Sequence, residues 1–183
     1  TRAKASHKVV EQLVLSHDLV LLQETHGNEF DLLSLQHRFV RHIIRGSFTA
    51  AERRGGLVFI IDPSFAEAYG SDIRERLEVT VIIPGRIAKV AFPGTASLMP
   101  LEVTNLHFEV EMQPTDPGFH GARLGFAHSL FRSLGPRGEV HSLVAGDWNS
   151  TPSDEPRFNP VEGTYAEDRS TVARRIEEGM VQY

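Results

Sequence analysis

The sequence predicts an α+β fold, in which a mixed sheet carries helices on its outside. Apolar residues recur at helical spacing near the start of the chain and again after residue 118. Between residues 39 and 109 the pattern changes to short apolar runs separated by turn formers. Helix, strand and helix therefore precede several antiparallel-looking strands, and a further helix and strand follow them. Two packed sheets are one way to arrange these elements.

The first part of the chain predicts two helices around one strand. A helix is expected over residues 2–16, because an apolar stripe runs along it that consists of Val9, Val10, Leu13 and Val14. The almost continuously apolar run at 18–23 predicts a strand that is buried on both faces. A second helix is expected over residues 28–36, with Asn28 as its N-cap.

The remainder of the chain predicts strands and one more long helix. Five strands are expected at 39–44, 56–61, 77–83, 86–92 and 100–109. Turn formers separate them, namely Gly55-Gly56, Asp62-Pro63, Pro84-Gly85 and Pro93-Gly94. Pro84-Gly85 stands where a hairpin connection would be. A helix over 119–134 and a buried strand over 141–145 follow, and a short helical candidate lies at 170–178.

Composition limits the functional classes. A chain of 183 residues suits one domain, and no apolar stretch approaches the roughly 18–20 residues that cross a membrane. The absence of cysteine excludes a disulfide framework and a thiolate metal site, and it fits an intracellular protein. The net charge of −5 argues against a protein that coats nucleic acid through bulk electrostatics. It leaves open an enzyme whose acidic site holds Mg²⁺.

Polar side chains stand at the end of the first predicted strand and along a later one. Glu24 directly follows the apolar strand, which would fix a carboxylate on a rigid element; a strand-end charge that faces water is the alternative. Strand alternation places Val103, Asn105 and His107 on one face. An Asn and a His in a dry core are costly unless they are hydrogen-bonded. A lone His on a strand is more often a hydrogen-bonded structural residue than a catalytic one, so a structural role is the alternative for His107.

A third polar segment follows the last predicted strand. That strand breaks at Gly146 and then presents Asp147 and Asn149. Asp147 can orient a water molecule or bind a metal ion, and Asn149 can hold a phosphate oxygen. The same Gly-Asp-x-Asn pattern is also compatible with an Asx-type turn.

Together and in this order, the segments LVLLQETH, EVTNLHFE and LVAGDWNSTP resemble the motif series of the exonuclease–endonuclease–phosphatase superfamily. The resemblance extends over about residues 8–160. It implies a four-layer α/β/β/α sandwich of two mixed sheets with outer helices. Trp148 stands where the family usually has Phe.

The resemblance also assigns roles to residues. It implies that Glu24 binds the metal ion and that His107 contacts the scissile phosphate, with Asn105 beside it. Asp147 would align the attacking water, and Asn149 would bind phosphate or metal. Arg123, on the helix before the Gly-Asp strand, is a further phosphate-binding candidate. The implied metal is Mg²⁺, with Mn²⁺ as the alternative; zinc is not favoured, because no His-x₃-His pair is present.

Two family features have no counterpart in this sequence. The family begins with a strand that carries a metal-binding Asn and ends with a strand that carries an Asp-His pair, whereas here Asp168 is followed by Arg169. We therefore expect residues 1–183 to be a single domain that is incomplete at both ends and part of a larger polypeptide. By itself this chain is expected to show weak or no activity.

The resemblance implies a divalent-metal-dependent phosphodiester hydrolase. The segments LLQETHG and IPGRIAKVAF look like those of DNA endonuclease domains in retroelement-like polyproteins, so DNA is the expected substrate. The alternatives are a small-molecule or lipid phosphoesterase of the same fold, and a catalytically inactive remnant or binding module. The expected location is intracellular, with the nucleus as one candidate compartment.

Overall fold

The computed structural model describes residues 2–49, 55–108, 119–136 and 138–149, together with the backbone of two short strands at 156–159 and 164–167. The chain divides into two compact units. Unit 1 comprises residues 1–107 and 135–146, and unit 2 comprises residues 108–134 and 147–183. The prediction of a single domain that is incomplete at both ends stays a prediction.

Two helices of unit 1 confirm the sequence prediction closely. Helix α1 spans Arg2–Ser16, and helix α2 spans Glu29–Arg38. Asn28 is the N-cap of α2: its Oδ1 accepts hydrogen bonds from the backbone N–H groups of Phe30 (2.8 Å) and Asp31 (3.3 Å). Asp31 Oδ2 in turn accepts from the backbone N–H of Asn28 at 2.9 Å, which completes a capping box.

The first sheet of unit 1, sheet A, has the order β1-β3-β2, and both of its pairings are antiparallel. Its strands are β1 (Leu19–Leu22), β2 (Ile43–Ser47) and β3 (Leu57–Ile61). Every residue of the central strand β3 is buried. The expected strand at 39–44 is wrong in position, because Phe39 instead ends α2, with its N–H bonded to Leu35 O at 2.9 Å.

The second sheet, sheet B, has the order β4-β5-β6-β7. Its strands are β4 (Val79–Ile83), β5 (Ile87–Phe92), β6 (Leu101–His107) and β7 (His141–Asp147). The expected hairpin at Pro84-Gly85 is confirmed, since β4 and β5 pair antiparallel across it. Hydrogen bonds join the starts of β6 and β7 (His141 N–H to Pro100 O, 2.8 Å) and their ends (Phe108 N–H to Asp147 O, 2.6 Å). These two strands therefore run in the same direction, and sheet B is mixed.

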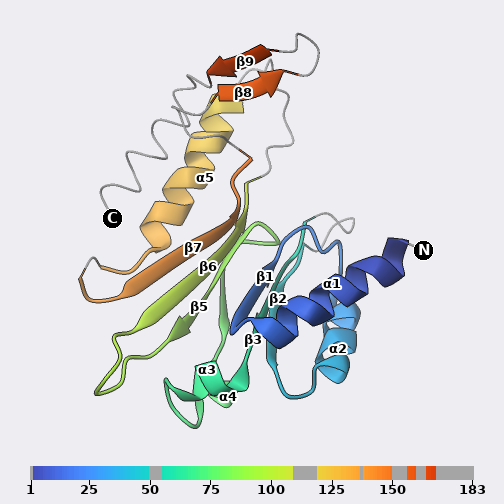
Figure 1. The fold of residues 1–183 in the computed structure, drawn as a ribbon. Coiled ribbons are helices and arrows are strands. Elements are labelled where there is room, and N and C mark those ends of the chain that lie inside the picture. Colours follow the sequence, from blue (N-terminus) through green and yellow to red (C-terminus); the bar gives the residue numbers. More distant parts are fainter. Residues whose placement is uncertain are drawn as a thin grey trace. The chain divides into compact units, whose positions relative to one another are not determined.

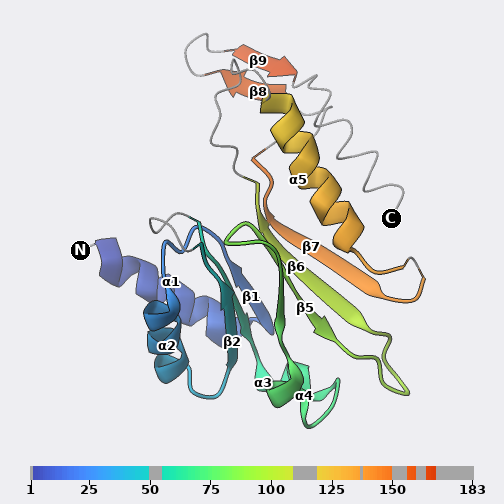
Figure 2. The same cartoon turned by 180° about the vertical axis from the view of Figure 1, so that it is seen from behind.

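The apolar side chains of unit 1 form two core layers. One lies between the sheets and includes Phe59 and Ile61 of sheet A and Val90 and Phe92 of sheet B. The other lies between sheet A and the helices, and includes Val14, Ile44, Val58 and Ile60. In Figure 1 and Figure 2, α1 and α2 lie on the side of sheet A that faces away from sheet B. Unit 1 thus has three layers, and the α+β class with two packed sheets and outer helices is confirmed.

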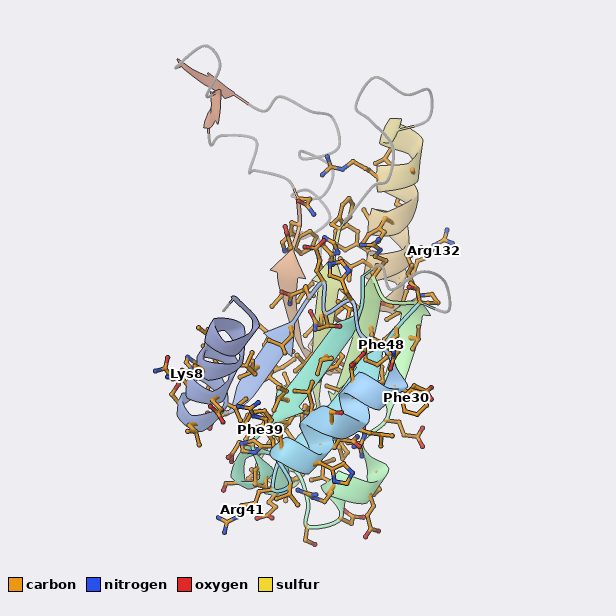
Figure 3. All side chains as sticks on the ribbon, turned by 90° about the vertical axis from the view of Figure 1, so that its right-hand side faces the viewer. Lys8, Phe30, Phe39, Arg41, Phe48 and Arg132 are labelled. Atoms are coloured by element: carbon orange, nitrogen blue, oxygen red, sulfur yellow. The ribbon has the colours of Figure 1, made fainter. Side chains whose placement is uncertain are left out.

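Charged side chains on the helical layer point outward, as this packing requires. Figure 3 shows Lys8 on α1 and Arg41, just after α2, directed away from the sheet. Phe39 lies at the end of α2 and belongs to the apolar layer beneath the helices. None of the helices in the described part of the chain has the length and apolar character that crossing a bilayer requires.

Two short helices of unit 1 were not predicted. Helix α3 spans Pro63–Glu67 and helix α4 spans Ile73–Arg76. The pair Asp62-Pro63 was assigned to a turn, but Asp62 caps α3 by accepting from the N–H groups of Ser64 and Phe65. Asp followed by Pro is also a helix-start pattern, because Pro suits the first helical position.

Unit 2 contains one helix and a small hairpin in its described residues. Helix α5 spans Phe119–Ser133, in agreement with the prediction for 119–134. Strands β8 (Pro156–Asn159) and β9 (Thr164–Glu167) pair antiparallel and were not predicted. The helical candidate at 170–178 lies outside the described residues.

Candidate active site

Glu24 lies just beyond the end of β1, in a segment with unusual backbone geometry. Glu24 and His26 both have φ +48°, in the left-handed region that non-glycine residues adopt at a cost. The side chain of Glu24 is 52% exposed. An exposed carboxylate on a constrained backbone is suited to bind a ligand, whereas it contributes little to core packing.

A chain of backbone contacts holds this segment in place. The N–H groups of Thr25 and His26 donate to the carbonyl oxygens of Gly56 (3.2 Å) and Gly55 (2.8 Å). Gly56 has φ +102°, and a Cβ there would lie 2.5 Å from Thr25 Oγ1, so the close approach requires glycine. The N–H of Gly56 donates to Gly85 O at 3.0 Å, in the hairpin turn between β4 and β5. That turn therefore supports the Glu24 segment through Gly55-Gly56.

Asn105 is fully buried, and it joins β6 to sheet A. Its Nδ2 donates to the carbonyl oxygens of Leu22 (3.1 Å) and Val58 (3.2 Å). Its Oδ1 accepts from Gln23 Nε2 at 2.7 Å. Val103 and Asn105 both face sheet A, as expected for residues on one face of β6. Val103 packs in the core between the sheets, and Asn105 bonds to Leu22 of sheet A. Phosphate binding by Asn105 stays a prediction; its contacts position the residue that precedes Glu24.

We expect Asn105→Leu to destabilise the protein by about 1–3 kcal/mol, because the carbonyl groups of Leu22, which is part-buried, and Val58, which is buried, lose this donor. Thr104→Val is a matched control at the neighbouring position. Thr104 is also fully buried, but its hydroxyl makes no hydrogen bond within the described residues. Its removal is expected to be neutral or stabilising. Denaturant unfolding measures both variants, and equal losses would contradict the assigned role of Asn105.

His107 ends β6 and lies beside Glu24. Its ring is 2% exposed, and its Nε2 is 3.6 Å from Glu24 Oε1. Arg86 contacts the other ring nitrogen, with Nη1 2.8 Å from Nδ1, and the backbone N–H of His107 donates to Arg86 O at 2.8 Å. The sequence prediction missed Arg86. The Pro84-Gly85 turn before it was the available signal, but turn chemistry gives no hint of a partner 21 residues away.

The remaining candidates gather in unit 2. Asp147 Oδ1 accepts a hydrogen bond from the backbone N–H of Asn149 at 2.9 Å, which is the Asx-type turn that the sequence left open. Asn149 has φ +44°, and its carbonyl oxygen accepts from Arg123 Nη2 at 3.2 Å. Arg123 is 8% exposed, and its guanidinium carbon lies 5.2 Å from the ring centroid of Phe108. The Phe108 ring also stacks on Trp148 at 6.3 Å.

The six site residues predicted from the sequence therefore form two groups in the structure. Glu24, Asn105 and His107 form one group in unit 1, linked through Gln23. Unit 2 holds the other group, which consists of Arg123, Asp147 and Asn149. Arg123 contacts the backbone of Asn149, so in this structure it supports the turn that carries Asp147.

The donor set suits a partly hydrated Mg²⁺ ion. Among the described residues no three His, Cys, Asp or Glu side chains cluster as an all-protein metal cage. Glu24 instead offers one exposed carboxylate at the end of a strand. Mg²⁺ keeps several water ligands and is commonly bound through one or two carboxylates, so a single exposed carboxylate fits it.

Comparisons with known proteins agree with this fold. Residues 1–178 match the model of the endonuclease/exonuclease/phosphatase family. No curated protein matches the sequence. An AP endonuclease from Archaeoglobus fulgidus superposes with a TM-score of 0.64 at 15% identity, over 96% of this chain and 64% of that one. A 3′ phosphatase from Neisseria, bound to a product DNA hairpin, gives a TM-score of 0.59 at 13% identity, over 97% and 66%.

The catalytic domain of APE2 from Xenopus laevis gives a TM-score of 0.57 at 12% identity, over 96% of this chain and 61% of that domain. At these identities the superpositions establish a shared fold. The chain spans less than two thirds of the length of each of these three structures.

Proposed function

Because the chain belongs to the endonuclease/exonuclease/phosphatase family, we propose that it carries the site of a divalent-metal-dependent phosphodiester hydrolase that acts on DNA. One observation supports this most: the exposed Glu24 carboxylate lies 3.6 Å from Nε2 of the buried His107, where β1 and β6 end. An anionic metal ligand beside a nitrogen donor suits a phosphate group, whose oxygens need both positive charge and hydrogen bonds.

The proposed mechanism assigns one task to each side chain. Glu24 would hold Mg²⁺, and the Nε2–H group of His107 would donate to a phosphate oxygen. Asp147 would accept a hydrogen bond from the attacking water and so align it with the phosphorus atom. Asn149 and Arg123 would hold phosphate oxygens, and Asn105 stands as a further candidate for that task. When bound, Mg²⁺ supplies Lewis-acid polarisation of the phosphoryl group and offsets its developing charge.

DNA is proposed as the substrate on two grounds. The segments LLQETHG and IPGRIAKVAF resemble retroelement endonucleases, and two of the similar solved structures are an AP endonuclease and a phosphatase in complex with a DNA hairpin. A retroelement-like polyprotein is proposed as the source on the sequence resemblance alone, and the nucleus is one candidate compartment. Mn²⁺ is expected to support the reaction in place of Mg²⁺, because both ions prefer oxygen ligands.

The test is nicking of supercoiled plasmid by the full-length protein that contains residues 1–183, with Mg²⁺ or with EDTA. Asp147→Asn is expected to lower the nicking rate roughly 10²–10⁴-fold, the range for loss of a general-base interaction. Asp72→Asn is the matched control, because Asp72 is an exposed carboxylate that pairs with Arg76 in unit 1. It should stay within about twofold of the wild type on this argument.

Other outcomes separate the competing functions. Cleavage of bis(p-nitrophenyl) phosphate without plasmid nicking would favour a small-molecule phosphoesterase. If neither substrate is cleaved and Mg²⁺ leaves the melting temperature unchanged, the hydrolase proposal fails and a binding module remains.

A further inference from the structure

Arg86 makes a directional contact with the ring of His107. Its Nη1 lies 2.8 Å from His107 Nδ1. A guanidinium group has five N–H donors and no acceptor, so Arg86 can only donate in this contact. His107 Nδ1 must therefore be the acceptor and carry no proton. A neutral imidazole has one N–H, which this contact assigns to Nε2.

The opposite ring nitrogen is the one that faces Glu24. Nε2 lies 3.6 Å from Glu24 Oε1, whereas Nδ1 faces Arg86. The ring is 2% exposed, and in such surroundings a hydrogen bond from an ionised donor is strengthened. The contact is thus strong enough to select one tautomer of His107.

We infer that Arg86 is a positioning residue that locks His107 in the Nε2–H tautomer, so that the ring presents a hydrogen-bond donor beside Glu24. This inference rests on the proposed function, in which that donor meets a phosphate oxygen. Without Arg86 both tautomers become accessible, and the Nδ1–H form would present a lone pair to an anionic phosphate.

The hairpin turn fixes the position of Arg86. Its carbonyl oxygen accepts a hydrogen bond from the backbone N–H of His107. The two residues therefore contact each other through a backbone hydrogen bond and through their side chains. Gly55 lets the turn approach closely: a Cβ on Gly55 would lie 2.9 Å from Gly85 O, although it would only reach van der Waals contact with Arg86 Cζ and Nε at 3.4 Å. The turn that supports the Glu24 segment through Gly55-Gly56 therefore also orients His107.

The test is ¹⁵N NMR of the histidine rings in the full-length protein at one neutral pH. His107→Gln identifies the His107 signals by their loss. In the wild type, Nδ1 is expected to show the shift of an unprotonated nitrogen and Nε2 that of a protonated one. In Arg86→Met this pattern should become a tautomer mixture. Arg86→Lys, which keeps a cationic donor, should restore it in part, and Arg76→Met should leave it unchanged, because Arg76 is exposed and pairs with Asp72.

Kinetics give an independent readout. Arg86→Met is expected to lower kcat roughly 10–100-fold, as does loss of groups that orient a ligand or catalytic side chain. Arg86→Lys should recover most of that loss, which simple unfolding would not allow. Melting temperatures of the variants exclude global unfolding as the cause.

Two results would overturn the inference: an Nδ1–H tautomer in the wild type, or an unchanged Nε2–H pattern in folded Arg86→Met. If Arg86→Met does not fold, the wild-type and Arg86→Lys spectra still decide. Failure of the proposed function is distinguishable, because the tautomer is observed without substrate. A wild type with the Nε2–H pattern that cleaves neither plasmid nor bis(p-nitrophenyl) phosphate would refute the hydrolase and leave the positioning role of Arg86 intact.

Discussion

Glu24→Gln is expected to abolish the proposed Mg²⁺-dependent cleavage of DNA. The substitution removes the carboxylate charge that lies beside His107 while it keeps the size of the side chain. Metal stabilisation of a phosphoryl transition state amounts to several kcal/mol, so kcat should fall by roughly 10²–10³-fold or more. The measurement is the initial rate of plasmid nicking against Mg²⁺ concentration, compared with the wild type.

The same substitution should leave the fold intact. Glu24 is half exposed, and Gln keeps a side-chain oxygen that can face the buried ring of His107, so the loss of stability should be small. Glu29→Gln is a suitable control, since Glu29 is an exposed carboxylate in the first turn of α2. It should keep the wild-type rate at a cost of about 0.3–1 kcal/mol in helix stability.

Binding of Mg²⁺ provides a second measurement that needs no turnover. An ion that binds only the folded state raises the melting temperature by mass action, so Mg²⁺ should stabilise the wild type and Glu29→Gln but not Glu24→Gln. If Glu24→Gln nicks plasmid at a near-normal rate and Mg²⁺ raises its melting temperature as in the wild type, Glu24 is not the metal ligand. The alternative, a strand-end charge that faces water, would then be correct.

The sequence predicted those elements whose signals are local. The N-cap at Asn28 is a signal within a few residues, and it is confirmed. Of the predicted stripe on α1, Val10, Leu13 and Val14 pack in the core, whereas Val9 is 53% exposed. The strand expected at 39–44 begins only at Ile43. Phe39 and Val40 are apolar residues just before it, so the sequence alone extends the strand to include them. Phe39 instead completes α2 and packs on sheet A, and periodicity in a short run does not separate these cases.

Strand ends were the reliable guide to the candidate site. An apolar strand that stops at Leu22 delivers Glu24, and alternation along β6 directs Asn105 and His107 toward sheet A. The partners of these side chains were beyond sequence reasoning. Arg86 reaches His107 because the antiparallel register of β5 against β6, which pairs Ile87 with Leu106, continues to these two residues. This contact depends on strand pairing rather than on spacing in the sequence.

Glycine signals were read as turns, although some of them reflect close packing. Gly55-Gly56 was assigned to a boundary before a strand, and its backbone does precede β3. Its carbonyl oxygens also accept hydrogen bonds from the N–H groups of Thr25 and His26. This close approach leaves no room for a side chain on Gly56. A residue without a side chain carries no pattern that would reveal its partner.

Gly146→Ala is the substitution with the largest expected effect on stability. Gly146 has φ +145°, and a Cβ there would lie 1.9 Å from the carbonyl oxygen of Leu106, a backbone atom of the neighbouring strand. Neither β6 nor β7 can yield locally, because both belong to the same hydrogen-bonded sheet. The strained backbone and the overlap together should cost about 2–5 kcal/mol of unfolding free energy.

Gly125→Ala makes the same chemical change where the opposite result is expected. A Cβ on Gly125 would meet no atom within 4 Å, and Gly125 lies inside helix α5, where Ala is favoured over Gly by about 0.8–1 kcal/mol. Denaturant unfolding of both variants measures the contrast. A Gly146→Ala variant as stable as the wild type would mean that the ends of β6 and β7 do not approach as closely as the structure shows. If the variant folds with its β7 end displaced, nicking should be lost as well, because Asp147 is the next residue in the chain and its carboxylate would move with that strand end.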